Sequence, residues 1–364
     1  MPEKKITVAG AGLAGLTAAI NLARDGWDVL VLDKEQRHGG RPEFRPDGAG
    51  SPFDFAALEA YVGVDIAPAC RTIDNMVVSV FDKRVEIAHS EGVQSYMVER
   101  GSRDSSLDSL LYERAVEAGV SFEWGHALKS PSDIAELPEG SIVATGLDVE
   151  GFEAIGVPYV PLWGWFAKRM VDENRTLGWA FVDDFTVDYA FITIINNTAF
   201  ALLFQREKPL TRRDKEKFEQ RVADEGLEFS AWTELVGGAS PHKCIGNPVL
   251  FKNNMIIAGT LAGVMEPMMN FGMLGAMISG KIAAIAVTDK GKAYEEFKRL
   301  TSFFRRSMIV KRLHDRSPVA LRKALWGLAA GSLGRLTPEQ RNKGFSFVPG
   351  YRDFGGPPGS SERC

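Results

Sequence analysis

The chain of 364 residues is 45% hydrophobic and 25% charged, with a net charge of −4, which is an ordinary globular composition. This composition excludes a disordered, collagen-like or disulfide-scaffold protein, and the length suits two domains or one large domain with a smaller one inserted. The three cysteines, Cys70, Cys244 and Cys364, are too widely spaced for a zinc site or a disulfide framework. We therefore expect a reduced, cytoplasmic protein without a metal centre.

The first thirty-five residues carry the most specific pattern. A β-branched run over residues 6–9 leads directly into Gly10-Ala11-Gly12-Leu13-Ala14-Gly15, then into a helical pattern and a second strand that ends at Asp33. In such a unit the first glycine makes a tight turn, the second admits a pyrophosphate, and the third lets the helix pack on the strand. Helix amides meet the phosphate charge, and Asp33 can accept a ribose hydroxyl hydrogen. The pattern predicts a dinucleotide site formed by Gly10, Gly12, Leu13, Ala14, Gly15, Asp33 and Lys34.

Two further segments favour FAD over NAD as the dinucleotide. The first contains Gly40 and Arg41 just beyond the second strand, and the other contains Ala144, Thr145 and Gly146 at the end of a late strand. Both resemble segments that FAD-dependent oxidoreductases place around the pyrophosphate and adenosine. NAD dehydrogenases have no reason to carry either segment.

The segment over residues 96–111 leads into a helix and resembles one flavoprotein group in particular. That group includes geranylgeranyl reductases and aromatic hydroxylases, in which an arginine at the start of this helix lies beside FAD. Two arginines compete for that role, because neither reproduces the family spacing to Asp108 and Leu111. Arg103 is the preferred candidate and Arg100 the second. The alternative is a solvated arginine at a helix start.

Residues 255–280 contain one charge, Glu266, and imitate a transmembrane helix in length. Pro267, Asn270 and five glycines favour a strand, a turn and a helix instead. The segment resembles the family's Gly-Asp-Ala-Ala-Gly-x-x-x-Pro motif, although Thr260 replaces the aspartate that grips a ribityl hydroxyl. The resemblance implies that this segment contacts FAD through Gly259, Thr260, Pro267, Phe271, Gly272 and Met273.

The middle of the chain, from about residue 150 to 245, is rich in aromatic and β-branched residues. A run around the Asn196-Asn197 turn predicts an antiparallel hairpin. In the family, an antiparallel sheet forms the wall above the flavin, so we expect a substrate pocket here. Its candidate residues are Trp163, Trp165, Phe166 and Phe191. The alternative for each aromatic residue is that it belongs to the core of the sheet.

The segment from Lys290 to Arg352 has 15 basic and four acidic residues, and aromatic and aliphatic residues recur near helical spacing in its first part. Helices of this kind over residues 291–335 can contact an anionic membrane surface. The alternative is that they pack on the cap domain. No nucleic-acid motif accompanies the charge, so we expect no nucleic-acid partner.

Together these patterns predict an α/β fold with a Rossmann-like FAD-binding domain, an antiparallel-sheet cap domain and a C-terminal helical segment. The expected boundaries are 1–70, 95–150 and 246–290 for the FAD-binding domain, 71–94 and 151–245 for the cap, 291–354 for the basic helices, and 355–364 for a flexible tail. The resemblance implies reduction of a carbon–carbon double bond in an apolar, prenyl-type substrate. The electrons would come through FAD from NAD(P)H or a small electron carrier. A flavin monooxygenase and a non-catalytic nucleotide- or lipid-binding protein are the alternatives.

Overall fold

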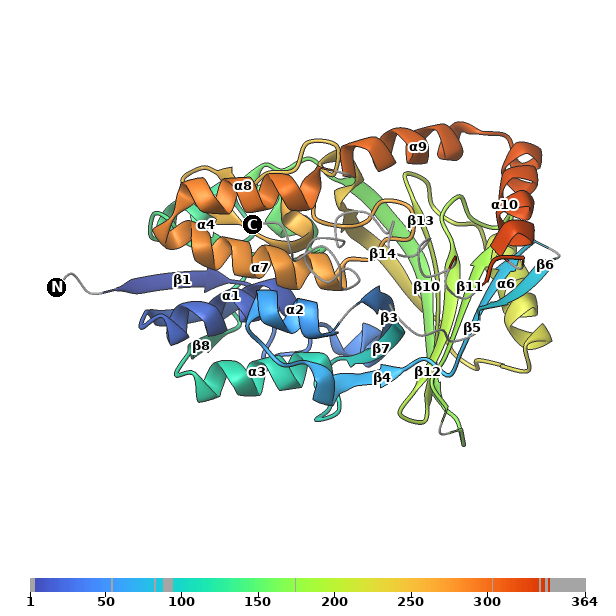
Figure 1. The fold of residues 1–364 in the computed structure, drawn as a ribbon, viewed down its shortest axis with the longest axis horizontal. Helices are drawn as coiled ribbons and strands as arrows, with labels where there is room; N and C mark the ends of the chain where they lie inside the picture. Colours follow the sequence, from blue (N-terminus) through green and yellow to red (C-terminus); the bar gives the residue numbers. More distant parts are fainter. Residues whose placement is uncertain are drawn as a thin grey trace.

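The computed structural model describes residues 4–340, apart from residues 54, 82, 88–93, 174, 303, 334 and 338–339. Its strands form three sheets, and Figure 1 shows the amino-terminal sheet with its helices on the left and the largest sheet on the right. This arrangement confirms the predicted class of a Rossmann-like α/β domain, an antiparallel cap sheet and C-terminal helices. The predicted tail over 355–364 lies outside the described residues, as does the basic segment beyond residue 340.

The first sheet has six strands in the order β15-β16-β9-β1-β2-β8. Its neighbouring strands run parallel except for the edge pair β15 and β16. Val8 and Val31 in its central strands are fully buried, as expected for a parallel sheet covered on both faces. The strands are β1 (Lys5–Ala9), β2 (Asp28–Asp33), β8 (Ser121–Trp124), β9 (Ile142–Val143), β15 (Phe251–Lys252) and β16 (Met255–Ile257).

Glycines allow unusually close helix packing in this part of the chain. A Cβ atom at Gly15 would lie 1.8 Å from the carbonyl oxygen of Gly10, and one at Gly280 would lie 2.3 Å from that of Ala14. The helix that contains Gly15 (residues 13–24) therefore packs directly on the loop after β1, and it crosses the helix that contains Gly280 (residues 273–288) at close range. The helices of this part are α1 (Leu13–Arg24), α2 (Phe55–Val62), α3 (Leu107–Glu117), α4 (Pro131–Glu136), α5 (Val149–Ile155) and α7 (Met273–Thr288).

A small three-stranded sheet joins this part to the cap. Its order is β3-β7-β4, with β3 (Asp47–Phe53), β7 (Gln94–Arg100) and β4 (Cys70–Thr72). A Cβ atom at Gly48 would lie 2.6 Å from Oγ1 of Thr193 in the cap. The start of β3 therefore passes directly against the cap sheet.

The cap sheet has seven strands in the order β14-β10-β13-β12-β11-β5-β6. Asn196 and Asn197, both with positive φ, form the predicted turn between β12 and β13. Phe218 of helix α6 (Arg212–Asp224) is fully buried against Phe181 and Phe185 of the cap. The strands are β5 (Asn75–Val80), β6 (Lys83–Ile87), β10 (Val160–Met170), β11 (Leu177–Val182), β12 (Ala190–Ile195), β13 (Thr198–Arg206) and β14 (Thr233–Ser240).

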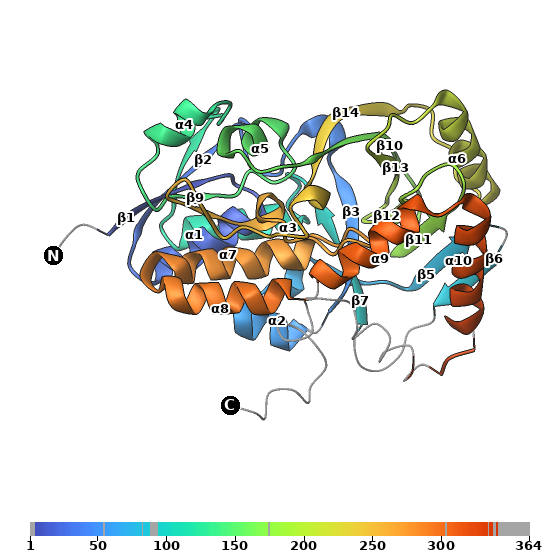
Figure 2. The same cartoon turned by 90° about the horizontal axis from the view of Figure 1, so that it is seen from above.

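Three helices follow α7, namely α8 (Lys290–Thr301), α9 (Phe304–Arg316) and α10 (Val319–Leu333). Figures 1 and 2 show α8 alongside α7, while α10 lies at the far end of the molecule beside β5 and β6. Residues 255–280 form β16, a turn and the start of α7, as predicted. Within the described part of the chain, none of the helices has the length and apolar character needed to cross a bilayer.

Helix α9 is fixed to the cap through buried charges. The Lys311 side chain, 2% exposed, lies 3.3 Å from Oδ1 of Asp188 and 2.8 Å from Oδ1 of Asp315. Arg206 of β13 donates to the same two carboxylates. Two cations and two carboxylates therefore neutralise one another between α9 and the cap sheet.

Candidate functional site

A cavity of about 600 Å³ lies between the first sheet and the cap sheet. Loops that follow the strands of the first sheet line one side, and aromatic and aliphatic side chains of the cap line the other. The predicted residues that line it are Gly10, Gly12, Leu13, Ala14, Asp33, Lys34, Gly40, Arg41, Arg100, Ala144, Thr145, Gly146, Phe166, Phe191, Gly259, Thr260, Phe271, Gly272 and Met273. The cavity thus joins a polar, glycine-rich side to an apolar side.

The glycine loop after β1 has the geometry that a phosphate needs. Gly10 adopts φ +113°, and a Cβ atom there would lie 2.4 Å from the carbonyl oxygen of Ala144. A Cβ atom at Gly12 would meet no atom within 4 Å and would project into open space. Gly15 does not line the cavity, since it packs against Gly10 instead. The three glycines thus supply a turn, an open approach for a ligand and a tight helix contact.

Asp33 closes the end of β2 beside this loop. Its carboxylate accepts hydrogen bonds from the backbone amides of Ala11 (2.6 Å) and Glu35 (2.9 Å). Burial raises the pKa of Asp33, although the two amides act in the opposite direction. Each carboxylate oxygen retains a second lone pair, which can accept a ribose hydroxyl hydrogen.

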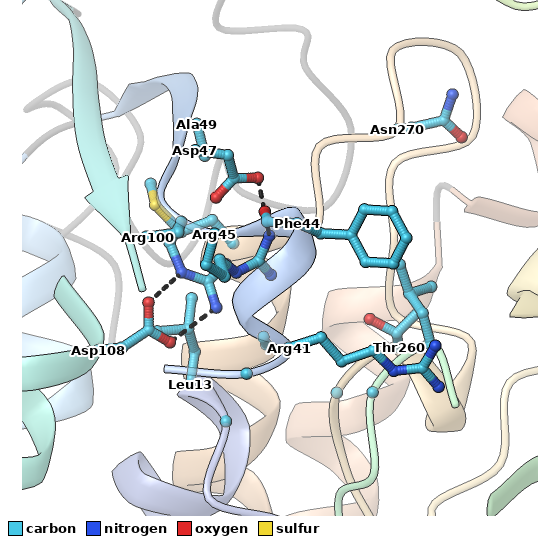
Figure 3. A pocket seen from close by; sticks show the side chains of 18 of the residues that line it. Leu13, Arg41, Phe44, Arg45, Asp47, Ala49, Arg100, Asp108, Thr260 and Asn270 are labelled. Carbon is cyan, nitrogen blue, oxygen red and sulfur yellow. Dashed lines mark hydrogen bonds and ion pairs between the residues drawn. The ribbon is translucent and has the colours of Figure 1, made fainter. Parts of the chain in front are cut away.

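Cations gather at the edge of the cavity near Asp33. Asp148 accepts a hydrogen bond from Lys34 and lies 3.5 Å from the guanidinium of Arg41. Arg41 is held at the cavity, where Figure 3 shows its side chain extended toward Thr260. Lys34 and Arg41 can both approach a ligand phosphate from there.

Two helix amino termini, those of α1 and α7, meet the cavity through Leu13 and Met273. Together they place the positive ends of two helix dipoles beside it. The Thr145 hydroxyl oxygen is buried at the cavity wall without a hydrogen-bond partner among the described residues. An open phosphate approach, two positive helix ends and an unsatisfied hydroxyl fit a dinucleotide with several hydroxyl groups.

Pro267 does not line the cavity, unlike its neighbours over residues 269–273. Its carbonyl faces His242 of the cap side at 3.2 Å. The turn is held from within by Glu266, whose carboxylate accepts from the amides of Met268 and Met269. Pro267 therefore shapes the loop before α7 and is removed from the predicted contact set.

The two candidate arginines occupy different environments. Arg100, at the end of β7, lines the cavity and donates two hydrogen bonds to Asp108 of α3, at 2.7 and 2.9 Å. Arg103 instead pairs with Glu99 at 2.8 Å and donates to Thr198, away from the cavity lining. The preference for Arg103 is therefore corrected, because the strand ends at Arg100 and directs that side chain inward (Figure 3).

The predicted aromatic pocket is divided by the alternation of strand β10. Phe166 lines the cavity, whereas Trp163 and Trp165 do not. Trp165 lies on the opposite face of the sheet, where the Lys215 ammonium of α6 is 5.3 Å from its ring centre. Successive side chains of a strand point to opposite faces, so these two tryptophans are removed from the predicted pocket.

Known proteins resemble parts of this chain in sequence. A family model described as an NAD(P)-binding Rossmann-like domain matches residues 8–59. The 4,4'-diaponeurosporene oxygenase of Staphylococcus haemolyticus is 44% identical over 55 residues, covering 15% of this chain and 11% of that protein. The NAD-dependent dihydropyrimidine dehydrogenase subunit PreT of Escherichia coli O157:H7 is 26% identical over 204 residues, covering 50% of this chain and 46% of that protein. The chain spans less than half the length of these curated relatives.

Solved structures match almost the whole chain. A geranylgeranyl bacteriochlorophyll reductase-like protein of Thermoplasma acidophilum has a TM-score of 0.58 and 15% identity, covering 94% of this chain and 91% of that one. The p-nitrophenol 4-monooxygenase of Pseudomonas putida DLL-E4 has a TM-score of 0.62 and 15% identity, covering 95% and 99%. The protein CtdE in complex with FAD has a TM-score of 0.58 and 15% identity, covering 95% and 99%. The chain has the fold of FAD-dependent oxidoreductases.

This flavoprotein fold confirms the predicted resemblance, and the matching structures include both a reductase-like protein and an oxygenase. It also brings residues to the cavity that were not among the predicted site residues. They come from the cap, from the start of β3 and from the loop before it, and they include Arg45, Asp47, Trp179, Tyr189, Leu202 and Phe204. Tyr189 donates a hydrogen bond to the carbonyl of Met269 and so links the cap to the loop before α7.

His242 forms a second link between the cap and that loop. Its ring accepts a hydrogen from Ser240 at Nδ1 and donates from Nε2 to the Pro267 carbonyl, because a carbonyl can only accept. Burial, assisted by the nearby charge of Arg206, lowers the pKa of His242 to about 3. The flavoprotein fold therefore holds this histidine in its neutral form.

A pH effect on stability follows from the neutral state of His242. An unfolded histidine has a pKa of about 6.5, so protonation favours the unfolded chain as the pH falls from 6.5 toward 3. We expect this residue to reduce the free energy of unfolding by about 2 kcal/mol between pH 7 and pH 5. Urea unfolding should show that His242→Gln reduces this pH dependence by that amount. His126→Gln, at an exposed position, is the control, and equal slopes for His242→Gln and the unsubstituted chain would contradict the assignment.

Proposed function

We propose that the chain is an FAD-dependent oxidoreductase that reduces a carbon–carbon double bond in an apolar, prenyl-type substrate. The observation that carries this proposal is one cavity of about 600 Å³, in which loops of the dinucleotide-binding type face an aromatic sheet. FAD fits the polar side of the cavity, and a long apolar molecule fits the other side. The substrate class rests on the resemblance of the chain to geranylgeranyl reductases.

FAD bound in this cavity would supply two-electron redox chemistry. The loop at Gly12 and the amino terminus of α1 would bind its pyrophosphate, and Asp33 would bind its adenosine ribose. Thr145 and Thr260 offer hydroxyl groups to the rest of the cofactor. The Thr260 hydroxyl can donate one hydrogen bond and accept one, whereas the family has an aspartate carboxylate that accepts hydrogen bonds from the ribityl chain. We therefore expect weaker retention of FAD than in those relatives.

The apolar side of the cavity offers the substrate surface. Phe166 and Phe191 line this side of the cavity together with Tyr189 and Phe204. The ring centres of Tyr189 and Phe204 are 5.2 Å apart. Such a surface excludes water and favours hydrocarbon over charged molecules. It suits a prenyl chain, and it also suits the aromatic substrate of the second candidate, a flavin monooxygenase. That candidate is favoured by the fold match to p-nitrophenol 4-monooxygenase.

The test begins with the visible spectrum of the purified protein, before and after heat release of any bound chromophore. Flavin absorption and released FAD are the expected result, and a spectrum that stays flat after incubation with FAD would contradict the proposal. Reduced protein is then mixed with geranylgeraniol without oxygen, and with oxygen in a parallel sample. Substrate-dependent oxidation without oxygen supports the reductase, whereas substrate-dependent oxygen consumption supports the monooxygenase.

The electrons would come from NAD(P)H or a small electron-carrier protein that binds transiently.

We further propose that the protein is cytoplasmic and contacts the anionic surface of a membrane through helices in residues 291–335. The exposed apolar residues of α9 and α10 support this contact, with Ile309 60%, Leu313 65% and Leu328 71% exposed. On α9, Ile309 and Leu313 lie opposite the buried Lys311, among exposed arginines at positions 305, 306, 312 and 316. Arginines beside an outward apolar stripe complement an anionic bilayer surface.

Introducing carboxylates into the α9 stripe should weaken membrane binding. Ile309→Asp combined with Leu313→Asp is expected to reduce binding to phosphatidylglycerol vesicles at least tenfold, since two apolar side chains lose burial and two negative charges are added. Co-sedimentation with phosphatidylglycerol and phosphatidylcholine vesicles measures the effect. Val236→Asp, at another exposed apolar position, is the matched control. Equal binding of all three proteins, or no binding of the unsubstituted chain, would contradict the contact.

A further inference from the structure

Asp47 lies at the boundary between the two halves of the cavity. It is the first residue of β3, opposite Arg100 of β7, and its neighbour Gly48 packs against Thr193 of the cap strand β12. The side chain lines the cavity. A group at this position can face both a cofactor held by the dinucleotide loops and a substrate held against the cap.

The two oxygens of the Asp47 carboxyl group have different surroundings. Oδ2 lies 2.9 Å from the guanidinium of Arg45, whereas Oδ1 is buried without a hydrogen-bond partner in the described part of the chain. Figure 3 shows Arg45 and Asp47 side by side above the Arg100–Asp108 pair. An unpartnered carboxylate oxygen in a buried position is costly, and protonation of the carboxyl group removes the buried negative charge.

Charged groups reach Asp47 from several elements. Burial raises its pKa most strongly, and the carboxylates of Asp108 and Glu99 raise it further, while Arg45 and Arg100 act in the opposite direction. Lys168 of β10 also approaches from the cap side, where its ammonium donates to the Pro42 carbonyl. The net direction of the pKa shift is upward, so Asp47 retains its proton to a higher pH than an exposed aspartate.

The other carboxylates that line the cavity are already engaged or lie elsewhere. Asp108 is paired with Arg100 and has a lowered pKa, and Asp148 is paired with Lys34 and Arg41. Asp33 accepts two backbone hydrogen bonds at the end of β2, with Glu35 beside it on the dinucleotide side. Among the carboxyl groups described in the lining, Asp47 alone combines a free oxygen with a position against the cap sheet.

We propose that Asp47 is the proton donor to the substrate, an inference that rests on the proposed double-bond reduction. An isolated alkene has no carbonyl to accept charge, so addition of a hydride to one carbon requires a proton at the other. The carboxyl group of Asp47, whose side chain is 22% exposed, would give its proton to one carbon, while the other takes a hydride from reduced FAD. The π bond breaks, two C–H bonds form and the flavin is oxidised by two electrons. Asp47 is left as a carboxylate, which Arg45 stabilises until water returns the proton.

The protonation state of Asp47 can be measured without turnover. Infrared spectra of the FAD-loaded protein, recorded against pH, should contain a carboxylic-acid carbonyl band that persists above the pH at which exposed carboxyl groups ionise. Asp47→Asn should remove this band, and the matched control Asp184→Asn, in a surface pair with Lys217, should retain it. A carboxylate at position 47 throughout pH 5–8 would overturn the proposal.

The second measurement is a single turnover with geranylgeraniol as the probe. Oxidation of the reduced, FAD-loaded protein by the alkene without oxygen should be about 100-fold slower in Asp47→Asn, as expected for loss of a general acid. The rate for the unsubstituted chain should fall as the pH rises through the Asp47 pKa, and Asp47→Asn should lack this dependence. Equal rates for the variant and the unsubstituted chain would overturn the role of Asp47 alone. A flavin-loaded unsubstituted chain that no alkene oxidises would overturn the double-bond reduction, and with it this role.

Discussion

Replacing Gly12 by valine is expected to abolish FAD binding while leaving the apoprotein fully folded. A Cβ atom at this position would meet no atom beyond its chain neighbours within 4 Å, and the backbone has φ −85° and ψ −177°, which valine adopts without strain. The same side chain would fill the space through which a pyrophosphate approaches the amino terminus of α1. We expect at least a 100-fold weaker FAD affinity, equivalent to roughly 3 kcal/mol.

Fluorescence titration with FAD and thermal unfolding of the apoprotein together test this expectation. Gly15→Ala is the matched comparison, because a Cβ atom there would lie 1.8 Å from the Gly10 carbonyl oxygen. That variant should unfold at a clearly lower temperature, with or without FAD. If Gly12→Val retained FAD, the pyrophosphate would have to bind elsewhere in the cavity.

Replacing Asp188 by alanine is expected to destabilise the chain by about 3–5 kcal/mol. The substitution leaves Arg206 and Lys311, which are 5% and 2% exposed, with Asp315 as their remaining carboxylate in the described network. Two cations would then share one carboxylate in a buried position, and the contact between α9 and the cap would weaken. Urea unfolding of the apoprotein measures the loss of stability.

The exposed pair between Asp184 and Lys217 provides the comparison for that measurement. Asp184→Ala should cost at most about 1 kcal/mol, as surface ion pairs usually contribute little. A similar small cost for Asp188→Ala would mean that water replaces the lost carboxylate. The buried network would then contribute little to holding α9 on the cap.

The dinucleotide half of the cavity was predictable because its signal is local. Gly10, Gly12 and Asp33 belong to one continuous strand–helix–strand unit, and their roles depend on neighbours within about 25 residues. Gly15 follows the same logic, since its packing partner is Gly10. A pattern of this kind also predicts geometry, because each glycine has a separate steric reason.

The apolar half was predictable as a sheet but not in its detail. Whether Trp165 or Phe166 faces the cavity depends on which face of β10 packs against α6, and a one-residue change reverses the answer. The choice between Arg100 and Arg103 depends likewise on where β7 ends. Such positions follow from pairing between strands that lie far apart in the chain.

Long-range charge contacts had no sequence signal at all. Asp188 and Lys311 are separated by more than a hundred residues and meet only because α9 crosses the cap. Asp47 follows an ordinary Arg-Pro dipeptide, and no motif marks it as a cavity residue. Its significance depends on burial and on a missing hydrogen-bond partner, both of which are properties of the folded chain.

The order of strands in the first sheet has a consequence for synthesis of the chain on the ribosome. Strand β9 pairs with β1 on one side and with β16 on the other, and all seven strands of the cap are made before β16. The first sheet of the nascent chain therefore stays incomplete, with β9 unpaired on one side and α7 missing, until residue 257 and the following helix have emerged. During that interval the cap can fold as a unit, and the unfinished edge is exposed to wrong pairing. We expect release of the chain before residue 257 to give an aggregating fragment instead of a smaller nucleotide-binding protein.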